Sequence, residues 1–252
     1  KEMKRFEEQV AVVAGGARGI GRAIAQRLAA EGGTVVILDV LQKRLLRTLE
    51  ELTGDNHLVS GEQVDITDEE KVRAVLDDVA LRYGRLDILV NCAGIVGESS
   101  VKVADYSTAV FDKTLEVNLK GAFLLTKYAV PHMLERHYGR ILHIASIGGK
   151  EGNPGMVGYA ASKSGLMGLV KGVGKEYAQQ GITVNGIAPA VIATEMNADT
   201  DPAMLKYMTD KIPMGRLGTV DEVAALAAWI VSEEASFNTA YVFDLSGGRA
   251  TF

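Results

Sequence analysis

The chain has 252 residues, of which 47% are hydrophobic and 23% charged, and its formal net charge is −5 at pH 7. That length can form one large α/β domain or two smaller ones around a substantial core. The mildly acidic charge does not predict a nucleic acid or an anionic membrane as partner, and the apolar stretches are too short to span a bilayer. Cys92 is the one cysteine, which excludes an intrachain disulfide and favours a reducing compartment. We therefore expect a soluble, cytoplasmic protein without a cleavable leader.

Short β-branched apolar runs alternate with longer amphipathic stretches from one end of the chain to the other. In chain order, the runs predict strands at residues 10–14, 34–39, 57–64, 88–91, 140–145, 182–187 and 241–244. The stretches between them predict helices at residues 19–31, 43–52, 68–83, 107–135, 159–179 and 220–231. Because the strands are continuously apolar, both faces of their sheet should be covered by helices. The pattern predicts an α/β fold with one doubly wound parallel sheet.

The segment over residues 190–216 departs from this alternation. It holds Pro202, Pro213, four methionines and several polar residues. Loops of this length inside a compact domain are usually functional. Because the sequence shows no linker, low-complexity tract or internal repeat, we predict a single domain over residues 1–252, in which residues 190–216 form a substrate loop.

A glycine-rich turn follows the first predicted strand and leads directly into a helix. Its glycines are Gly15, Gly19 and Gly21, a Gly-x-x-x-Gly-x-Gly spacing. Backbone amides at a helix N-terminus attract anions, and glycines let the chain approach a pyrophosphate closely. The turn therefore predicts a dinucleotide site in the first strand–helix unit.

Asp39 ends the second predicted strand, about 20 residues after the glycine turn, where a carboxylate accepts hydrogen bonds from adenosine ribose. Its charge would repel a 2′-phosphate, and the next residues, Val40 and Leu41, offer no cation. We therefore predict NAD(H) rather than NADP(H). Arg18 in the glycine turn could reach a 2′-phosphate, and the alternative for Asp39 is a helix-capping or solvated side chain.

A second pattern consists of Ser146, Tyr159 and Lys163. Tyrosine and lysine four residues apart lie on one face of a helix. An ammonium beside a phenol favours the phenolate and lowers its pKa from about 10. A serine hydroxyl from a neighbouring strand end can hydrogen-bond a substrate oxygen. The pattern predicts proton transfer to or from an alcohol oxygen.

Together these motifs resemble the short-chain dehydrogenase/reductase family over nearly the whole chain. Ala14, Cys92 and Ala190 stand where that family usually has threonine, asparagine and glycine. The resemblance places adenine, the nicotinamide ribose and the nicotinamide along the remaining strand ends. The cofactor-binding residues that it implies are Gly15, Arg18, Gly19, Ile20, Gly21, Asp39, Asp65, Ile66, Asn91, Ala93, Gly94, Tyr159, Lys163, Pro189, Ile192 and Thr194.

The resemblance also implies a Rossmann-type domain with a seven-stranded parallel sheet and a catalytic set of Asn118, Ser146, Tyr159 and Lys163. Tyr159 would remove the alcohol proton while hydride passes to NAD⁺, and Ser146 and Tyr159 would hold the substrate oxygen. Lys163 would lower the tyrosine pKa and bind ribose, and Asn118 would support a water between the lysine and solvent. The same resemblance implies a homotetramer built through the helices that start near Ser107 and Tyr159. No metal site is expected, because the histidines lack zinc-ligand spacing.

Lys150, Glu151 and Asn153 follow Ser146 closely, which suits a hydroxylated or anionic small molecule. The alternative is that Lys150 and Glu151 pair with each other at the surface. Three segments resemble family members that act on sugars and 2-keto-3-deoxy sugar acids: residues 149–154, the Ala-Pro-Ala-Val-Ile run at 188–192 and the C-terminal Gly-Gly-Arg-Ala-Thr-Phe. A sugar or 2-keto-3-deoxy sugar acid is therefore the leading substrate hypothesis. The alternatives are a 3-oxoacyl-[acyl-carrier-protein] reductase and a non-catalytic NAD sensor or scaffold.

Overall fold

A seven-stranded, fully parallel sheet forms the centre of the computed structural model, which describes residues 4–55, 57–195 and 202–251. The strand order is β3-β2-β1-β4-β5-β6-β9. The strands are β1 (Val10–Ala14), β2 (Thr34–Asp39), β3 (Val59–Gln63), β4 (Ile88–Asn91), β5 (Gly139–Ile144), β6 (Ile182–Pro189) and β9 (Val242–Leu245). The predicted Rossmann-type sheet is thereby confirmed, with strand ends that shift by at most a few residues.

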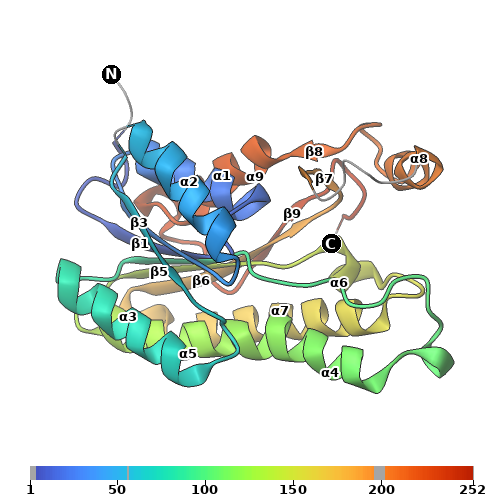
Figure 1. Cartoon of the computed structure of the whole chain (residues 1–252), viewed down its shortest axis with the longest axis horizontal. Coiled ribbons are helices and arrows are strands. Elements are labelled where there is room, and N and C mark those ends of the chain that lie inside the picture. The colour runs from blue at the N-terminus through green and yellow to red at the C-terminus, as the bar shows by residue number, and fades with distance from the viewer. Residues whose placement is uncertain (1–3, 56, 196–201, 252) are drawn as a thin grey trace.

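Helices cover both faces of the sheet. Figure 1 shows α1 (Gly19–Ala30), α2 (Gln42–Gly54) and α9 (Val220–Ile230) on one face. The other face carries α3 (Glu69–Tyr83), α4 (Thr108–Leu115), α5 (Gly121–Leu134) and α7 (Val157–Glu176) (Figure 1). The described residues also contain α6 (Ile147–Glu151), α8 (Pro202–Asp210) and 3-10 turns at Val103–Asp105, Ala178–Gln180 and Glu233–Ala235.

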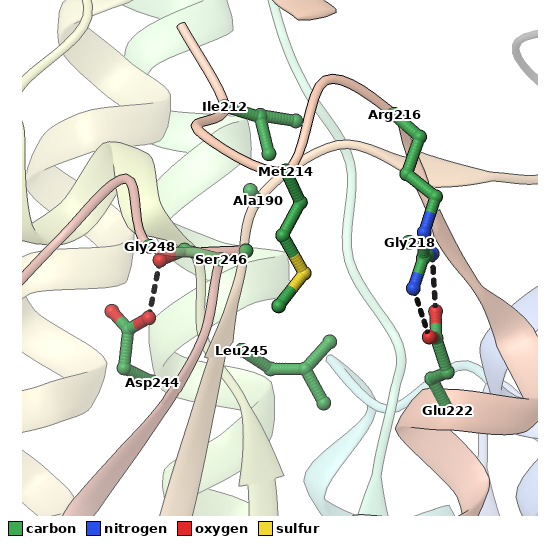
Figure 2. Close-up of a pocket in the computed structure, with 11 residues that line it drawn as sticks. Ala190, Ile212, Met214, Arg216, Gly218, Glu222, Asp244, Leu245, Ser246 and Gly248 are labelled. Carbon is green, nitrogen blue, oxygen red and sulfur yellow. Dashed lines mark hydrogen bonds and ion pairs between the residues drawn. The ribbon is translucent and has the colours of Figure 1, made fainter.

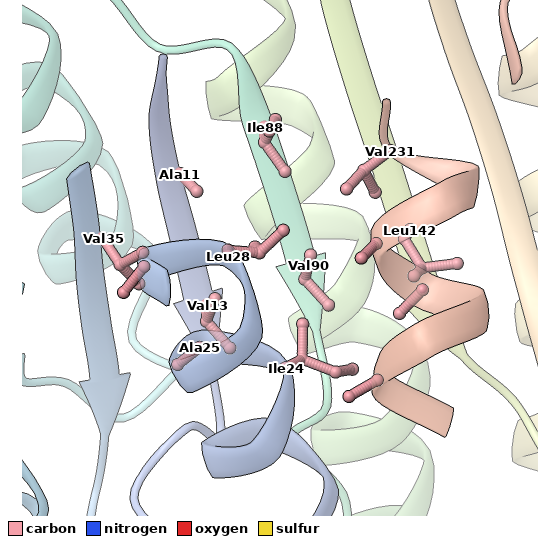
Figure 3. Close-up of a cluster of buried hydrophobic side chains, with 14 of the residues drawn as sticks. Ala11, Val13, Ile24, Ala25, Leu28, Val35, Ile88, Val90, Leu142 and Val231 are labelled. Atoms are coloured by element: carbon pink, nitrogen blue, oxygen red, sulfur yellow. The ribbon is translucent and has the colours of Figure 1, made fainter. Parts of the chain in front are cut away.

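The period of two along each strand divides the core into two layers. In β1, Ala11 and Val13 face the layer under α1 and α9, whereas Val10 and Val12 face the layer under α3 and α5. Figure 3 shows the first layer, where side chains of β1, β2, β4 and β5 meet those of α1 and α9. All strands but the edge strands β3 and β9 are almost wholly buried, which explains why they are apolar without alternation.

Two helix starts are fixed by side chains of the kind expected there. Asp68 accepts a hydrogen bond from the backbone amide of Lys71 at the start of α3. Thr219 and Glu222 form a reciprocal capping box at the start of α9. Within the residues that the structure describes, no helix has the length and apolarity needed to cross a bilayer.

The helix predicted over residues 107–135 is present but changes its winding in the middle. A π-helical turn at Glu116–Lys120 separates α4 from α5. It contains Asn118, whose side chain bonds the backbone of Ile95 twice, at 2.8 Å each. Such a turn accommodates an inserted residue and is frequent at functional sites.

Two short helices and a short strand pair were not predicted. The helix α6 follows Ser146, a short strand pair joins β7 (Ile192–Ala193) to β8 (Gly218–Thr219), and α8 lies inside the segment predicted as a loop. Each is short. The helix α6 packs on α7 and β6, and β7 pairs with a strand distant in sequence, which a local pattern does not report. Residues 196–201 of the predicted substrate loop lie outside the described residues.

Candidate active site

The predicted site residues gather at the carboxyl edge of the sheet. The glycine turn follows β1, Asp39 ends β2, Asn91 ends β4 and Ser146 comes two residues after β5. In a doubly wound sheet, ligands bind in the crevice outside these strand ends, where the strand order reverses. Here that reversal falls between β1 and β4. The topology alone thus brings together residues that are far apart in the sequence.

The glycine turn is packed too tightly for side chains. Gly15 has φ +71°, and a Cβ there would lie 2.6 Å from the backbone nitrogen of Ala93. A Cβ at Gly21 would lie 2.1 Å from the carbonyl oxygen of Gly15. Arg18 is exposed at the N-cap of α1, and no side chain caps this helix. The first turn, with Gly19 and Ile20, therefore offers its amides to an anion, and the cradle fits a dinucleotide pyrophosphate.

Asp39 is buried, with 8% of its surface exposed. Its Oδ2 accepts a hydrogen bond from the amide of Ala17 at 3.0 Å, and its Oδ1 accepts one from the amide of Leu41 at 2.9 Å. The carboxylate therefore ties the end of β2 to the glycine turn. It is neither solvated nor the cap of α2, since Leu41 is the N-cap of that helix.

The segment after β6 returns to the glycine turn. Pro189 ends β6, and Ile192 is buried in the short strand β7. A Cβ placed on Gly19 would lie 3.7 Å from Cγ2 of Thr194, so Thr194 lies beside the start of α1. The segment after β6 therefore lies against the expected pyrophosphate site.

The chain after β4 lines the middle of the groove. Asn91 is buried, and its Oδ1 accepts a hydrogen bond from the amide of Ala93 at 3.1 Å. Gly94 lies close to two candidate catalytic side chains, since a Cβ there would be 3.2 Å from Asn118 Oδ1 and 3.5 Å from Lys163 Nζ. Burial raises the pKa of the Cys92 thiol to about 12, which makes it an unreactive packing group.

Asp65 and Ile66 differ in their surroundings. Asp65 accepts hydrogen bonds from the amide and hydroxyl of Thr67, and these bonds lower its carboxyl pKa despite partial burial. Ile66 is buried against Gly121, where a Cβ would lie 2.5 Å from its Cδ1. Asp65 thus holds the turn at Thr67 and Ile66 packs against α5, in addition to any contact with adenine.

Ser146, Tyr159 and Lys163 converge around α6 and the start of α7. Ser146 is the N-cap of α6, and its Oγ accepts a hydrogen bond from the amide of Gly148 at 3.1 Å. Lys163 lies one turn after Tyr159 on α7, with its Nζ 5.8 Å from the centre of the tyrosine ring. That Nζ donates a hydrogen bond to the carbonyl oxygen of Ile144 at 2.8 Å. The lysine is buried and fixed to the end of β5.

The ionisation of these groups differs from the expectation. Burial raises the pKa of Tyr159, and its hydrogen bond with Ser146 opposes that rise only in part. Burial lowers the pKa of Lys163 to about 8. Burial thus outweighs the Ser146 hydrogen bond at Tyr159, and it disfavours the charged form of both Tyr159 and Lys163. The direction expected for the phenol pKa, which Lys163 and the oxidised nicotinamide were together to lower, is opposite to the one that burial imposes.

Asn118 is completely buried in the π-helical turn. Besides its two bonds to Ile95, its Nδ2 donates to Oγ of Ser162 at 2.9 Å. The side chain therefore fixes the loop after β4 against α7, one residue before Lys163. The expected water between lysine and solvent stays a prediction.

His143 in β5 lies behind the site and was not among the predicted functional residues. It is fully buried, with Nδ1 3.4 Å from Asn91 Nδ2 and Nε2 3.0 Å from Thr126 Oγ1. Burial, together with the nearby Lys163 charge, lowers its pKa to about 3, so the ring is neutral. A histidine in an apolar strand gives no local signal that its ring will lie behind the site and contact Asn91 and Thr126. Among the described residues, no group of three or more His, Cys, Asp or Glu side chains could hold a metal ion.

The charged residues after Ser146 pair with the C-terminal segment and not with each other. Lys150 Nζ lies 3.3 Å from Asp244 Oδ2, and Arg249 donates to Oε2 of Glu151 at 3.0 and 2.7 Å. The side chains of both cations are almost buried. The alternative of a surface Lys150–Glu151 pair is therefore wrong, and these two ion pairs tie α6 to β9 and to the segment that follows it.

A cavity of about 310 Å³ opens beside this segment. Figure 2 shows Met214 and Leu245 inside it and the Arg216–Glu222 ion pair at its rim. Its lining residues are Ala190, Ile212, Met214, Arg216, Gly218, Glu222, Asp244, Leu245, Ser246, Gly247 and Gly248. The cavity thus lies between the end of β6, the segment before α9 and residues 244–248. Asp244, which lines it, also pairs with Lys150 of α6.

A pyrophosphate cradle at the switch point of a doubly wound sheet, with a buried Ser-Tyr-Lys cluster at the same edge, defines a nicotinamide-dependent oxidoreductase. The family profile described as Enoyl-(Acyl carrier protein) reductase matches residues 15–250. The chain belongs to the short-chain dehydrogenase/reductase family, as the sequence motifs predict.

Individual relatives cover almost the whole chain. A 2-dehydro-3-deoxy-L-rhamnonate dehydrogenase (NAD(+)) of Sphingomonas sp. is 42% identical over 98% of this chain and 98% of its own. A 3-oxoacyl-[acyl-carrier-protein] reductase of Thermotoga maritima is 36% identical over 97% of this chain and 98% of its own. Among solved structures, gox2181 superposes with a TM-score of 0.94 at 33% identity and covers 98% of both chains. A variant actinorhodin polyketide ketoreductase with NADPH gives a TM-score of 0.91 at 33% identity, over 98% of this chain and 100% of that one.

Proposed function

We propose that this protein is an NAD⁺-dependent dehydrogenase that oxidises a secondary alcohol of a sugar acid to the ketone. The substrate class that we propose is the 2-keto-3-deoxy sugar acids. The observation that carries the proposal is the convergence of Ser146, Tyr159 and Lys163 at the edge of the sheet that also bears the glycine turn. The 42% identity to a dehydrogenase named for such a sugar acid supports the substrate class.

Each candidate catalytic residue has a task in this proposal. Tyr159 removes the hydroxyl proton of the substrate, and Ser146 donates a hydrogen bond to the same oxygen. Bound NAD⁺ supplies the hydride acceptor, and its positive charge favours the phenolate form of Tyr159. Lys163, held by Ile144, binds nicotinamide ribose hydroxyls and relays protons, while Asn118 keeps the loop after β4 in place.

The preference for NAD⁺ is part of the proposal and rests on Asp39. Its carboxylate is buried at the end of β2, so a 2′-phosphate placed there would meet a negative charge in a site of low dielectric. Arg18 is exposed at the other side of the turn and is the competing determinant. We expect kcat/KM to be at least about 100-fold higher with NAD⁺ than with NADP⁺, and Asp39→Ser to reduce that ratio. Equal efficiency with both cofactors contradicts this assignment.

The experiment that tests the substrate class is a screen of sugar acids, polyols and simple secondary alcohols with NAD⁺ and NADP⁺ in parallel, read as absorbance of the reduced cofactor. Oxidation of a 2-keto-3-deoxy sugar acid supports the proposal. Activity on 3-oxoacyl thioesters with NADPH, and on no sugar acid, favours the second candidate, a 3-oxoacyl-[acyl-carrier-protein] reductase, which the Thermotoga maritima relative supports. A protein that binds NADH but turns over no compound of either group is the sensor or scaffold.

Residues 190–216 are proposed as the substrate loop of a single catalytic domain spanning residues 1–252. Ala190, Met214 and Arg216 of this segment line the cavity beside the C-terminal segment, which is roomy enough for part of a small substrate. Substitution of Met214 by Trp should raise KM for the substrate more than it changes the dissociation constant of NADH. One cooperative unfolding transition is the expected behaviour of a single domain.

A homotetramer in the cytoplasm completes the proposal. Leu115, Leu119, Phe123 and Leu169 form an exposed apolar groove between α4, the π-helical turn and α7, and Phe123 is 46% exposed. Phe252, which by the family resemblance would reach a neighbouring subunit, lies outside the described residues. Light scattering should give a mass of four chains, and Phe123→Glu should lower it; a monomeric wild-type protein contradicts the assembly. The single cysteine fits the reducing compartment.

A further inference from the structure

The side-chain amide of Asn153 lies beside the candidate catalytic groups. The position that a Cβ on Gly148 would take is 2.8 Å from Asn153 Nδ2, 3.4 Å from Ser146 Oγ and 3.5 Å from Tyr159 Cε1. A single point is therefore close to three polar or reactive side chains. They can converge there because residue 148 has no side chain to keep them apart.

Asn153 has hydrogen-bonding capacity to spare. Its backbone carbonyl accepts a bond from the amide of Met156 at 3.1 Å. Its side chain makes no hydrogen bond within residues 4–55, 57–195 and 202–251, although the residue is half-buried. A side-chain amide without a protein partner is free to donate to a ligand or to water.

The helix that precedes Asn153 is fixed in place. Besides the ion pairs of Lys150 and Glu151 with the C-terminal segment, Ser164 Oγ donates to the carbonyl oxygen of Gly149 at 2.6 Å. Asn153 follows α6 by two residues, so its place relative to Ser146 is set by the protein before substrate arrives. Preorganised polar groups of this kind select substrates by the oxygen atoms that they match.

We propose that Asn153 binds an oxygen on the carbon next to the reacting alcohol and so selects vicinal diols and α-hydroxy ketones over simple alcohols. The inference rests on the proposed function, because the reacting hydroxyl is placed between Ser146 and Tyr159. The amide donates to the neighbouring substrate oxygen through Nδ2, as the closest of the three groups around Gly148. A polyhydroxylated acid satisfies this donor, whereas a bare alkyl chain leaves it unpaired.

The test compares butane-2,3-diol with butan-2-ol, which differ by the neighbouring hydroxyl alone. For the wild type, kcat/KM with NAD⁺ should be higher for the diol. In Asn153→Ala and Asn153→Leu, the ratio of the two kcat/KM values should fall about 10-fold or more, while kcat/KM for butan-2-ol stays within about threefold. Gln179→Ala, which removes an exposed amide beyond the end of α7, is the matched control and should leave the ratio unchanged.

The outcomes separate this inference from the sugar-acid proposal. A ratio that falls in the Asn153 variants supports the inference even if the substrate screen finds no sugar acid, in which case only the substrate class fails. The inference is overturned if the ratio of the two kcat/KM values is unchanged in the variants, or if kcat/KM falls equally for both alcohols. It is also overturned if the wild type oxidises neither alcohol or does not prefer the diol. The dissociation constant of NADH is measured in each variant, and a purely structural role for Asn153 would change it.

Discussion

Lys163 and Tyr159 lie one helical turn apart, yet the lysine Nζ donates to the carbonyl of Ile144 and sits 5.8 Å from the centre of the tyrosine ring. The lysine is therefore anchored to β5 and not to the phenol. Since burial raises the pKa of Tyr159 in this state, the phenolate needs a further source of positive potential. In the proposed reaction, the positive charge of the oxidised nicotinamide ring would supply that potential near Tyr159.

Replacement of Tyr159 by phenylalanine should lower kcat for alcohol oxidation by at least about 100-fold, because it removes the general base. The dissociation constant of NAD⁺, measured by fluorescence or calorimetry, should be nearly unchanged, since the ring still fills its place. Turnover close to that of the wild type would remove Tyr159 from this role.

Replacement of Ser146 by alanine should shift the pH dependence of alcohol oxidation. The reaction needs the deprotonated phenol, so kcat rises with pH through the apparent pKa of Tyr159. The Ser146 hydrogen bond lowers that pKa against the effect of burial. In Ser146→Ala the rise in kcat should therefore move to higher pH, and Ser146→Thr, which keeps the hydroxyl, should restore it. A fall in kcat at all pH values with an unmoved midpoint contradicts this reasoning.

His143 should make the folded protein sensitive to acid. Burial lowers its pKa to about 3 from the ordinary value of 6.5, so between these values the unfolded chain binds a proton that the folded chain does not. Stability then falls as pH falls, by up to about 1.4 kcal/mol per pH unit. When the pH falls from 7 to 5, the unfolding free energy should decrease in the wild type by about 2 kcal/mol more than in His143→Gln. Urea titration at both pH values measures this difference. An identical pH dependence in both proteins would show that His143 is protonated in the folded state.

The ion pair between Arg249 and Glu151 should position the helix that Ser146 caps. Arg249→Met keeps the packing of the side chain but removes the charge, so α6 loses the ion pair between Glu151 and Arg249. We expect kcat to fall about 10-fold while the dissociation constant of NADH is unchanged. Arg249→Lys should recover part of the loss. A change in cofactor affinity alone, with normal kcat, contradicts a role in positioning Ser146.

The alternation of strands and helices along the chain is sufficient to predict the doubly wound sheet. The glycine turn and Asp39 have a local physical meaning, because a helix N-terminus attracts an anion and a strand end presents its side chains to the sheet edge. The Tyr159–Lys163 spacing similarly follows from the helix period. Charge pairing was less predictable. Lys150 and Glu151 are neighbours in sequence, but their partners lie 94 and 98 residues away.

What the sequence determined by itself was therefore the class of fold, the cofactor edge and the set of reactive side chains, since each depends on short-range periodicity or on a residue type at a strand end. Only the tertiary structure decided how those side chains are surrounded. Burial reversed the expected pKa shift of Tyr159, gave Asn118 a partner in Ile95, placed His143 behind the site and left Asn153 beside it. Desolvation and long-range contacts exist only once distant segments have packed together, so no local pattern carries them.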